Sequence, residues 1–201
     1  MNKLLMGFVA ASTMLSVSLL SGCATNKTEI LATGDMGVII ERATGSVQIV
    51  NTTSQTSLAR INGLGDLSHA SIVYSRDERF AYVFGRDGGL TKVDITTQQI
   101  DKRIIQGGNS IGGAISQDGK LVAVSNYTPG GVRIFDSETL ELKFDLPAIG
   151  RDGKQSKTVG LVDAPGDKFV FSLFDSAEIW IVDLSTGEPV ITKFFDVGLK
   201  P

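Results

Sequence analysis

The sequence is poor in the residues that most metal and covalent cofactor sites need. Its 201 residues include one histidine, His69, and one cysteine, Cys23. A structural zinc site needs about four cysteine, histidine or carboxylate ligands, and covalent haem attachment needs a Cys-x-x-Cys-His motif. A lone cysteine also excludes an intramolecular disulfide. We therefore expect no metal site built by the protein alone and no covalently bound haem.

Two further absences narrow the function. A Ser-His-Asp triad would have to use His69, and the sequence has no Gly-x-Ser-x-Gly motif to present a serine nucleophile. Positive charge is also scarce. Without residues 1–22, which include Lys3, 18 Lys and Arg residues face 22 Asp and Glu residues, a net charge of −4. No basic field is available to attract nucleic acid, so we expect no nucleic-acid partner.

The N-terminus has the pattern of an export signal. Lys3 is followed by an uncharged, mostly apolar run, Leu4 to Leu20, and then by Ser21-Gly22-Cys23. Leu20 to Cys23 resembles a bacterial lipobox, in which cleavage precedes the cysteine that carries the lipid. We predict a lipoprotein signal peptide over residues 1–22, lipidation of Cys23, a polar tether over residues 23–33, and a periplasmic location anchored to a bacterial membrane. An uncleaved anchor and a plain secretory signal are the alternatives.

The remaining chain is repetitive. An apolar residue followed by Asp or Asn recurs with its last residue at Asn51, Asp94, Asp136 and Asp183, at intervals of 43, 42 and 47 residues. Each repeat reads as four short strands separated by turns. A period of this length with four short strands is the signature of β-propeller blades. The longer last interval contains a polar stretch, residues 151–157, which we interpret as a solvated loop or a flap.

The strand composition supports the same fold class. Residues 80–84, 121–124 and 169–173 are nearly continuous apolar runs, as expected for inner strands packed on both faces. Residues 140–144 alternate apolar and polar, as expected for an outer strand with one wet face. The glycine-rich stretch Gly107–Gly113 lacks the lysine of a phosphate loop and indicates close backbone approach at a strand start. We predict an all-β fold of four-stranded antiparallel blades over residues 34–201.

About four blades fit between Leu31 and Lys200, the minimum of the propeller range. We therefore expect the chain to be the N-terminal half of a larger propeller. If it is complete, the alternatives are a four-bladed ring or an open arc with exposed edges.

The long motifs of the chain resemble a known family. They read GLGDLSHAS, VFGRDGGLTKVD, GNSIGGAISQDGKLVAVSNYTPGGVRIFD and GLVDAPGDKFVFSLFDSAEIWIVD. Together they resemble the NirF family of haem d1 biosynthesis proteins and, more distantly, NirN and the d1-haem domain of cytochrome cd1 nitrite reductase. The resemblance implies an eight-bladed propeller that binds haem d1 or its precursor non-covalently near its axis. It also implies other haem d1 maturation proteins and cytochrome cd1 nitrite reductase as partners.

His69 lies just before an apolar strand, and most lone histidines in such a position are structural. In the nitrite reductases that the chain resembles, a histidine placed like His69 is the axial ligand of the tetrapyrrole iron. The resemblance therefore implies this role for His69, and Asp66 is a candidate to orient its imidazole. Arg86 is expected to pair with a tetrapyrrole carboxylate; its alternative is a buried pair with Asp87. Asn126 and Tyr127 lie at the corresponding strand end of the next blade and would offer the ligand a hydrogen bond and an aromatic face. The alternative is that they are an ordinary turn asparagine and a tyrosine at the rim of the blade.

Asp163 marks a departure from the nitrite reductases, which have distal histidines near this strand. With no second histidine, the chain is not expected to reduce nitrite by that chemistry. A carboxylate over the macrocycle can act as a general acid or base, so Asp163, with His69, is the candidate catalytic residue. The alternative is a plain turn aspartate.

Three functions remain open at this point. The first is a haem d1 maturation protein that catalyses or assists a late step resembling an oxidation or dehydrogenation. The second is a non-catalytic carrier of haem d1, and the third is a propeller scaffold for protein contacts.

Overall fold

Fifteen strands and one short 3-10 helix, η1 (Thr33–Asp35), make up the regular structure of residues 32–198, the part of the chain that the computed structural model describes. No helix within these residues is long and apolar enough to cross a membrane. The predicted signal peptide, the lipidated Cys23 and all but the last two residues of the tether lie outside the described residues. They stay predictions, which lipid labelling of the wild type and of Cys23→Ser would test.

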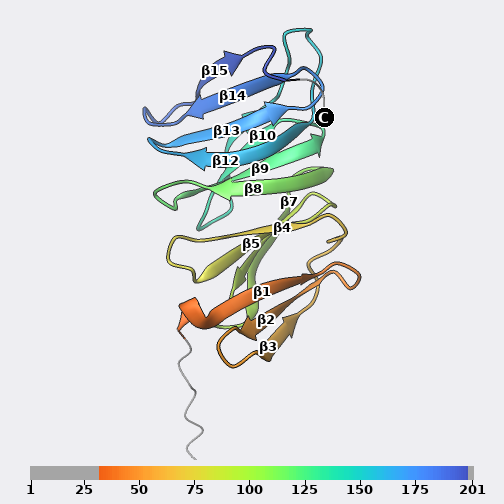
Figure 1. The fold of residues 1–201 in the computed structure, drawn as a ribbon, viewed down its shortest axis with the longest axis vertical. Helices are drawn as coiled ribbons and strands as arrows, with labels where there is room; N and C mark the ends of the chain where they lie inside the picture. The colour runs from red at the N-terminus through yellow and green to blue at the C-terminus, as the bar shows by residue number, and fades with distance from the viewer. Residues whose placement is uncertain (1–31, 199–201) are drawn as a thin grey trace, which may run out of the picture. The chain divides into compact units, whose positions relative to one another are not determined.

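The strands form four antiparallel sheets, each built from consecutive strands (Figure 1). The first sheet contains β1 (Met36–Glu41), β2 (Ser46–Asn51) and β3 (Thr56–Ile61). The second contains β4 (Ser71–Tyr74), β5 (Phe80–Phe84), β6 (Gly89–Asp94) and β7 (Gln99–Ile105). The third contains β8 (Asn109–Ile115), β9 (Leu121–Thr128), β10 (Val132–Asp136) and β11 (Leu142–Leu146). The fourth contains β12 (Thr158–Ala164), β13 (Lys168–Leu173), β14 (Glu178–Asp183) and β15 (Val190–Phe194).

Three of the four sheets have the four strands that the repeat predicts. The first sheet differs, because it has three strands among the described residues. Its strand β2 ends at Asn51, the position predicted for the end of a third strand, so β1 takes the place of the second. Only four described residues precede β1, and the Thr-Gly-Asp sequence of η1 favours a tight turn over an extended strand.

The apolar cores lie between neighbouring sheets. Successive residues of a strand point to opposite faces. Accordingly, Ala81 and Val83 of β5 join the cluster shared with the first sheet, while Tyr82 and Phe84 join the cluster shared with the third. The third core, between the last two sheets, contains Phe171 and Trp180. A strand covered on both faces needs apolar residues at every position, which explains the continuous runs in the sequence.

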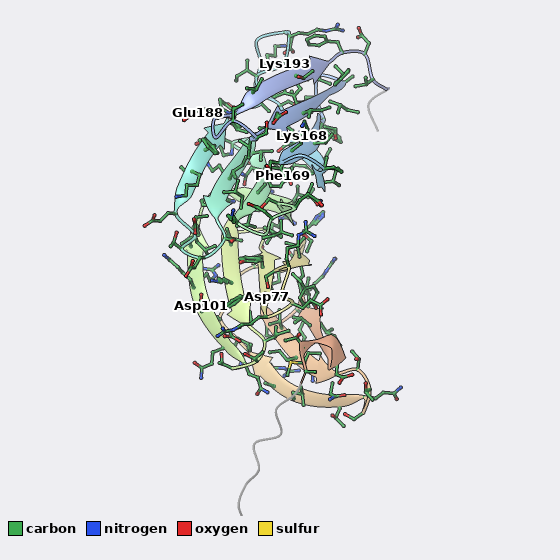
Figure 2. The ribbon with its side chains drawn as sticks, turned by 90° about the vertical axis from the view of Figure 1, so that its left-hand side faces the viewer. Asp77, Asp101, Lys168, Phe169, Glu188 and Lys193 are labelled. Carbon is green, nitrogen blue, oxygen red and sulfur yellow. The ribbon has the colours of Figure 1, made fainter. Side chains whose placement is uncertain are left out.

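The first strands of the last three sheets lie next to one another, β4 against β8 and β8 against β12. The corresponding ends of the neighbouring sheets therefore lie together and form two faces. We call the end where these strands begin the His69 face; it includes Arg86, Tyr127, Lys157 and Phe174. We call the end where they finish the Arg76 face. Figure 2 looks onto the Arg76 face, on which the labelled Asp77, Lys168 and Glu188 lie in or beside the strand-connecting turns.

Candidate functional site

His69 lies in the loop that leads into β4, with its imidazole exposed. The side chains of Leu67 and Ala70, which precede and follow His69 in the loop, are buried and anchor the loop to the core. No hydrogen bond or ion pair to the imidazole is found within residues 32–198, so its ring nitrogens have no protein partner in that part of the chain. An exposed imidazole on a rigidly anchored loop is a suitable axial donor for a tetrapyrrole iron. The structural histidine alternative finds no support in these contacts.

Asp66 does not orient His69. Its carboxylate accepts a hydrogen bond from the Ser68 amide at 2.8 Å. Hydrogen bonds from the Ser68 side chain and amide, with the positive charge of Arg86, hold the pKa of Asp66 below its usual range. Asp66 is therefore a turn residue that stays ionised and attracts Arg86.

Arg86 is exposed, and the expected alternative of an Arg86–Asp87 pair is wrong. Asp87 instead binds Arg103, 2.6 Å away, and accepts a hydrogen bond from the Gly89 amide at 3.0 Å. The Arg86 amide donates to the carbonyl of Asp66 at 2.8 Å, which ties the β5–β6 turn to the His69 loop. Its guanidinium forms no ion pair within 4 Å among the described residues and is free to pair with a carboxylate ligand.

Asn126 is not available to a ligand on this face. Its side chain is fully buried and exchanges two hydrogen bonds with the amide of Gln106, at 2.9 and 3.2 Å. Gln106 also donates to the hydroxyl of Ser110 at 2.7 Å. We call these three side chains the amide network. It lies beneath the His69 face, so Asn126 supports the site instead of contacting its ligand.

Tyr127, the residue after Asn126, is half-buried on the His69 face. Its ring lies 6.5 Å, centroid to centroid, from that of Phe174, and the Lys157 ammonium lies 5.4 Å from the Phe174 centroid. Phe174 and Lys157 were missed by the sequence reasoning. The repeat contains the signal for Phe174, because Tyr127 and Phe174 occupy equivalent positions in successive sheets. Each directly follows the second-strand residue that pairs with the start of the first strand: Asn126 pairs with Ser110, and Leu173 pairs with Thr158.

Asp163 lies at the opposite end of the sheets, on the Arg76 face. Its carboxylate accepts hydrogen bonds from Arg76, at 2.9 Å, and from Gln117. Arg76 also donates to the carbonyls of Ile115 and Ser116, both at 2.9 Å. The three first strands are tied together at their ends by this one guanidinium. The structure therefore does not bring Asp163 together with His69.

A groove of about 520 Å³ runs along the first strands next to this cluster. Its floor is apolar, with Val73, Ile115 and Leu161, and its charged groups are Arg76, Glu78 and Asp163. Two carboxylates against one guanidinium leave the groove net negative. Such a groove repels an anionic ligand.

The polar loop of residues 151–157 is docked onto the fourth sheet and is not a free flap. The Arg151 guanidinium pairs with Asp196, and the Arg151 amide donates to the buried carboxylate of Glu178 at 2.8 Å.

Within residues 32–198, no group of three or more His, Cys, Asp or Glu side chains is placed to hold a metal ion.

Known proteins resemble this chain over nearly all of the described part. The family model "Cytochrome D1 heme domain" matches residues 31–201. The chain is 64% identical over 190 residues to Protein NirF of Pseudomonas aeruginosa and 56% identical over 191 residues to Protein NirF of Stutzerimonas stutzeri. These matches cover 93% and 94% of this chain and 48% of each relative, so the chain spans about half the length of the curated relatives it matches.

More distant relatives agree in fold. The dihydro-heme d1 dehydrogenase of Pseudomonas aeruginosa is 31% identical over 157 residues, which are 78% of this chain and 32% of that protein. The structure of the dihydro-heme d1 dehydrogenase NirN in complex with DHE superposes with a TM-score of 0.75 at 27% identity, over 81% of this chain and 35% of that one. Hydrazine synthase of Kuenenia stuttgartiensis, at 20% identity and a TM-score of 0.57, covers 83% of this chain and 48% of that one and shares the fold alone.

Proposed function

The chain belongs to the Cytochrome D1 heme domain family, and from this premise we propose that it acts in haem d1 biosynthesis by binding a d1-type tetrapyrrole on the His69 face. The observation that carries the proposal is that the exposed His69 imidazole and the Arg86 guanidinium, which has no ion pair within the described residues, lie on one face, in a chain 64% identical to a NirF protein. Imidazole suits the tetrapyrrole iron, and guanidinium suits a carboxylate of its rim.

The chemistry of the step is proposed to be an oxidation or dehydrogenation of the bound precursor. The support for this class is the 31% identity to a dihydro-heme d1 dehydrogenase. The residues of this chain bind and orient the substrate: His69 fixes the iron side and Arg86 fixes the rim. Asp163 takes no part in this proposal, because it lies on the other face.

Titration of the full-length protein with a purified d1-type tetrapyrrole, followed by visible absorbance, tests the proposal. We expect wild-type binding with a band shift typical of axial imidazole, and His69→Ala to lose that shift and weaken binding about tenfold or more. Lys120→Ala, an exposed cation on the Arg76 face, is the matched control and should bind like the wild type. An unchanged spectrum and affinity in His69→Ala would show that the histidine is not the ligand.

The same samples separate an enzyme from a carrier. Incubation of the loaded protein with an electron acceptor converts the precursor spectrum to that of the product if the protein catalyses the step. Stable binding without conversion, followed by transfer to apo nitrite reductase, identifies a carrier. If the wild type binds no tetrapyrrole at all, the scaffold function stands and the proposal fails.

A further inference from the structure

The third and fourth sheets place an aromatic pair and a cation side by side on the His69 face. The ring centroids of Tyr127 and Phe174 are 6.5 Å apart at an interplanar angle of 55°, and the Lys157 ammonium is 5.4 Å from the Phe174 centroid. Both rings are half-buried, and Lys157 is exposed. These three residues, here called the aromatic cluster, come from sequence positions up to 47 apart and meet only in the folded chain.

Buried hydrogen bonds fix the backbone beneath the aromatic cluster. The backbone N–H of Asn126 donates to the hydroxyl of Thr158 at 3.1 Å. That hydroxyl lies within donating distance of two backbone carbonyls, those of Asn126 and Gly131. Thr158 is fully buried. Since Asn126 precedes Tyr127 and Thr158 follows Lys157, this contact holds both cluster residues in register. The Phe174 amide completes the arrangement by donating to the Lys157 carbonyl at 2.9 Å.

The side chains of the aromatic cluster are only loosely engaged within the described residues. The Tyr127 hydroxyl has no hydrogen-bond partner there. The Lys157 ammonium is 3.7 Å from the carboxylate of Asp175, a long contact between two exposed groups that contributes little. Asp175 is held mainly by the Lys157 amide, at 3.1 Å. The ammonium can therefore turn toward another anion at small cost.

The position in the second sheet that corresponds to Phe174 is a glycine, so the sheets present different kinds of side chain on the His69 face. Phe84 pairs with Ser71 as Leu173 pairs with Thr158, so Gly85 corresponds to Phe174. A side chain at Gly85 would meet the Asp87 carboxylate at 2.8 Å and the Asp66 carbonyl at 3.2 Å. The second sheet therefore has no ring at this position and presents polar groups such as His69 and Arg86, whereas the next two sheets present rings and an ammonium.

We propose that the aromatic cluster is a second contact area for the d1-type tetrapyrrole, in which Phe174 and Tyr127 contact the conjugated rim and Lys157 pairs with a peripheral carboxylate. This inference rests on the proposed function. Because β4 contacts β8 and β8 contacts β12, the ends of the three sheets meet on the His69 face, with Tyr127 one sheet and Phe174 two sheets away from His69. The aromatic cluster therefore contacts the periphery of the ligand and not the iron. Aromatic faces with a nearby cation suit a planar polyanion.

The test uses the full-length protein and the same absorbance titration. We expect Phe174→Leu and Lys157→Gln each to weaken binding about fivefold, while the band that reports the imidazole ligand keeps its wild-type shape. Lys157→Gln should also lower the dependence of the affinity on salt. Phe174→Tyr, which keeps the ring, should bind like the wild type. Lys154→Gln, an exposed cation of the same loop outside the aromatic cluster, is the matched control.

The outcomes separate this inference from the proposed function. Normal binding by the wild type with a changed band in His69→Ala, but unchanged affinity and salt dependence in both cluster variants, overturns the aromatic cluster and leaves the proposed function standing. Equal weakening by Lys154→Gln and Lys157→Gln also overturns it, since general charge would then explain the effect. Absence of wild-type binding overturns both. Matching far-ultraviolet circular dichroism of all variants establishes that the variants are folded.

Discussion

The two faces of the blades hold their ends together by different means. On the Arg76 face the charges are paired with one another: Arg76 with Asp163, Arg79 with Asp94 and Lys168 with Asp183, all within 3 Å. On the His69 face the Asp87–Arg103 pair, 2.6 Å apart, and the buried amide network give the support, while the surface residues His69 and Arg86 are left without partners in the described chain. Exposed side chains can be spared for a ligand where other groups beneath them hold the structure.

The largest effect is expected from breaking the amide network. Asn126→Ala leaves the buried Gln106 amide without its reciprocal partner and opens a small cavity. Such a change costs about 3 kcal/mol of unfolding free energy. Urea denaturation of the full-length protein measures it, with exposed Asn62→Ala as a control that should stay within about 0.5 kcal/mol of the wild type. A loss below about 1 kcal/mol would mean that the network does not support this face.

A smaller effect is expected from the Arg76 face. Arg76→Met removes the bonds to Asp163 and to the carbonyls of Ile115 and Ser116, but the side chain is partly exposed and water replaces some of them. We expect a loss of about 1–2 kcal/mol in the same experiment. Arg86→Met removes an equivalent charge from the His69 face and should change stability by less than about 0.5 kcal/mol. Equal losses in the two variants would remove the distinction between the faces.

The smallest effect is a dependence on acid pH that belongs to the Arg76 face. Burial raises the pKa of Asp94, but hydrogen bonds from Thr96, Arg79 and Thr97 outweigh it and hold the pKa at about 2. Because this folded pKa lies below the unfolded value, the stabilisation is fully present above about pH 4 and is lost as the pH falls toward 2.

Asp94→Asn should therefore flatten the fall in unfolding free energy between pH 5 and pH 2 by about 1 kcal/mol, since the exposed Arg79 partner is screened by solvent. Urea denaturation at several pH values measures the slope. Glu188→Gln, an exposed carboxylate on the same face, should keep the wild-type slope. A wild-type slope in Asp94→Asn would show that acid acts elsewhere.

The sequence was sufficient to predict the blade architecture, because a strand covered on both faces requires an unbroken apolar run and the spacing of Asp94, Asp136 and Asp183 sets the repeat. The glycine-rich stretch also indicated a close approach correctly: a side chain at Gly113 would lie 2.3 Å from both the Phe84 ring and the Ala123 carbonyl. The first sheet has three strands among the described residues, where the repeat predicts four.

The site was predicted less completely, since its contacts cross between sheets. Local sequence marked His69 and Arg86, which the structure leaves exposed on one face. It could not show that Asp87 binds Arg103, nor that Asn126 turns inward to Gln106, because both partners are distant in sequence. Asp163 was grouped with His69 because the nitrite reductases that the chain resembles have distal histidines near this strand. Strand direction, which places it at the far end, follows only from the pairing of β12 with β13.

Each sheet is made of consecutive strands joined by short turns, and this has a consequence for how the chain folds. Forming any one sheet closes only short loops, which costs little chain entropy and is fast. A sheet can therefore assemble while later residues are still being synthesised, and the next sheet then packs on its apolar face. Growth of the domain follows the order of translation, from one end of the chain to the other.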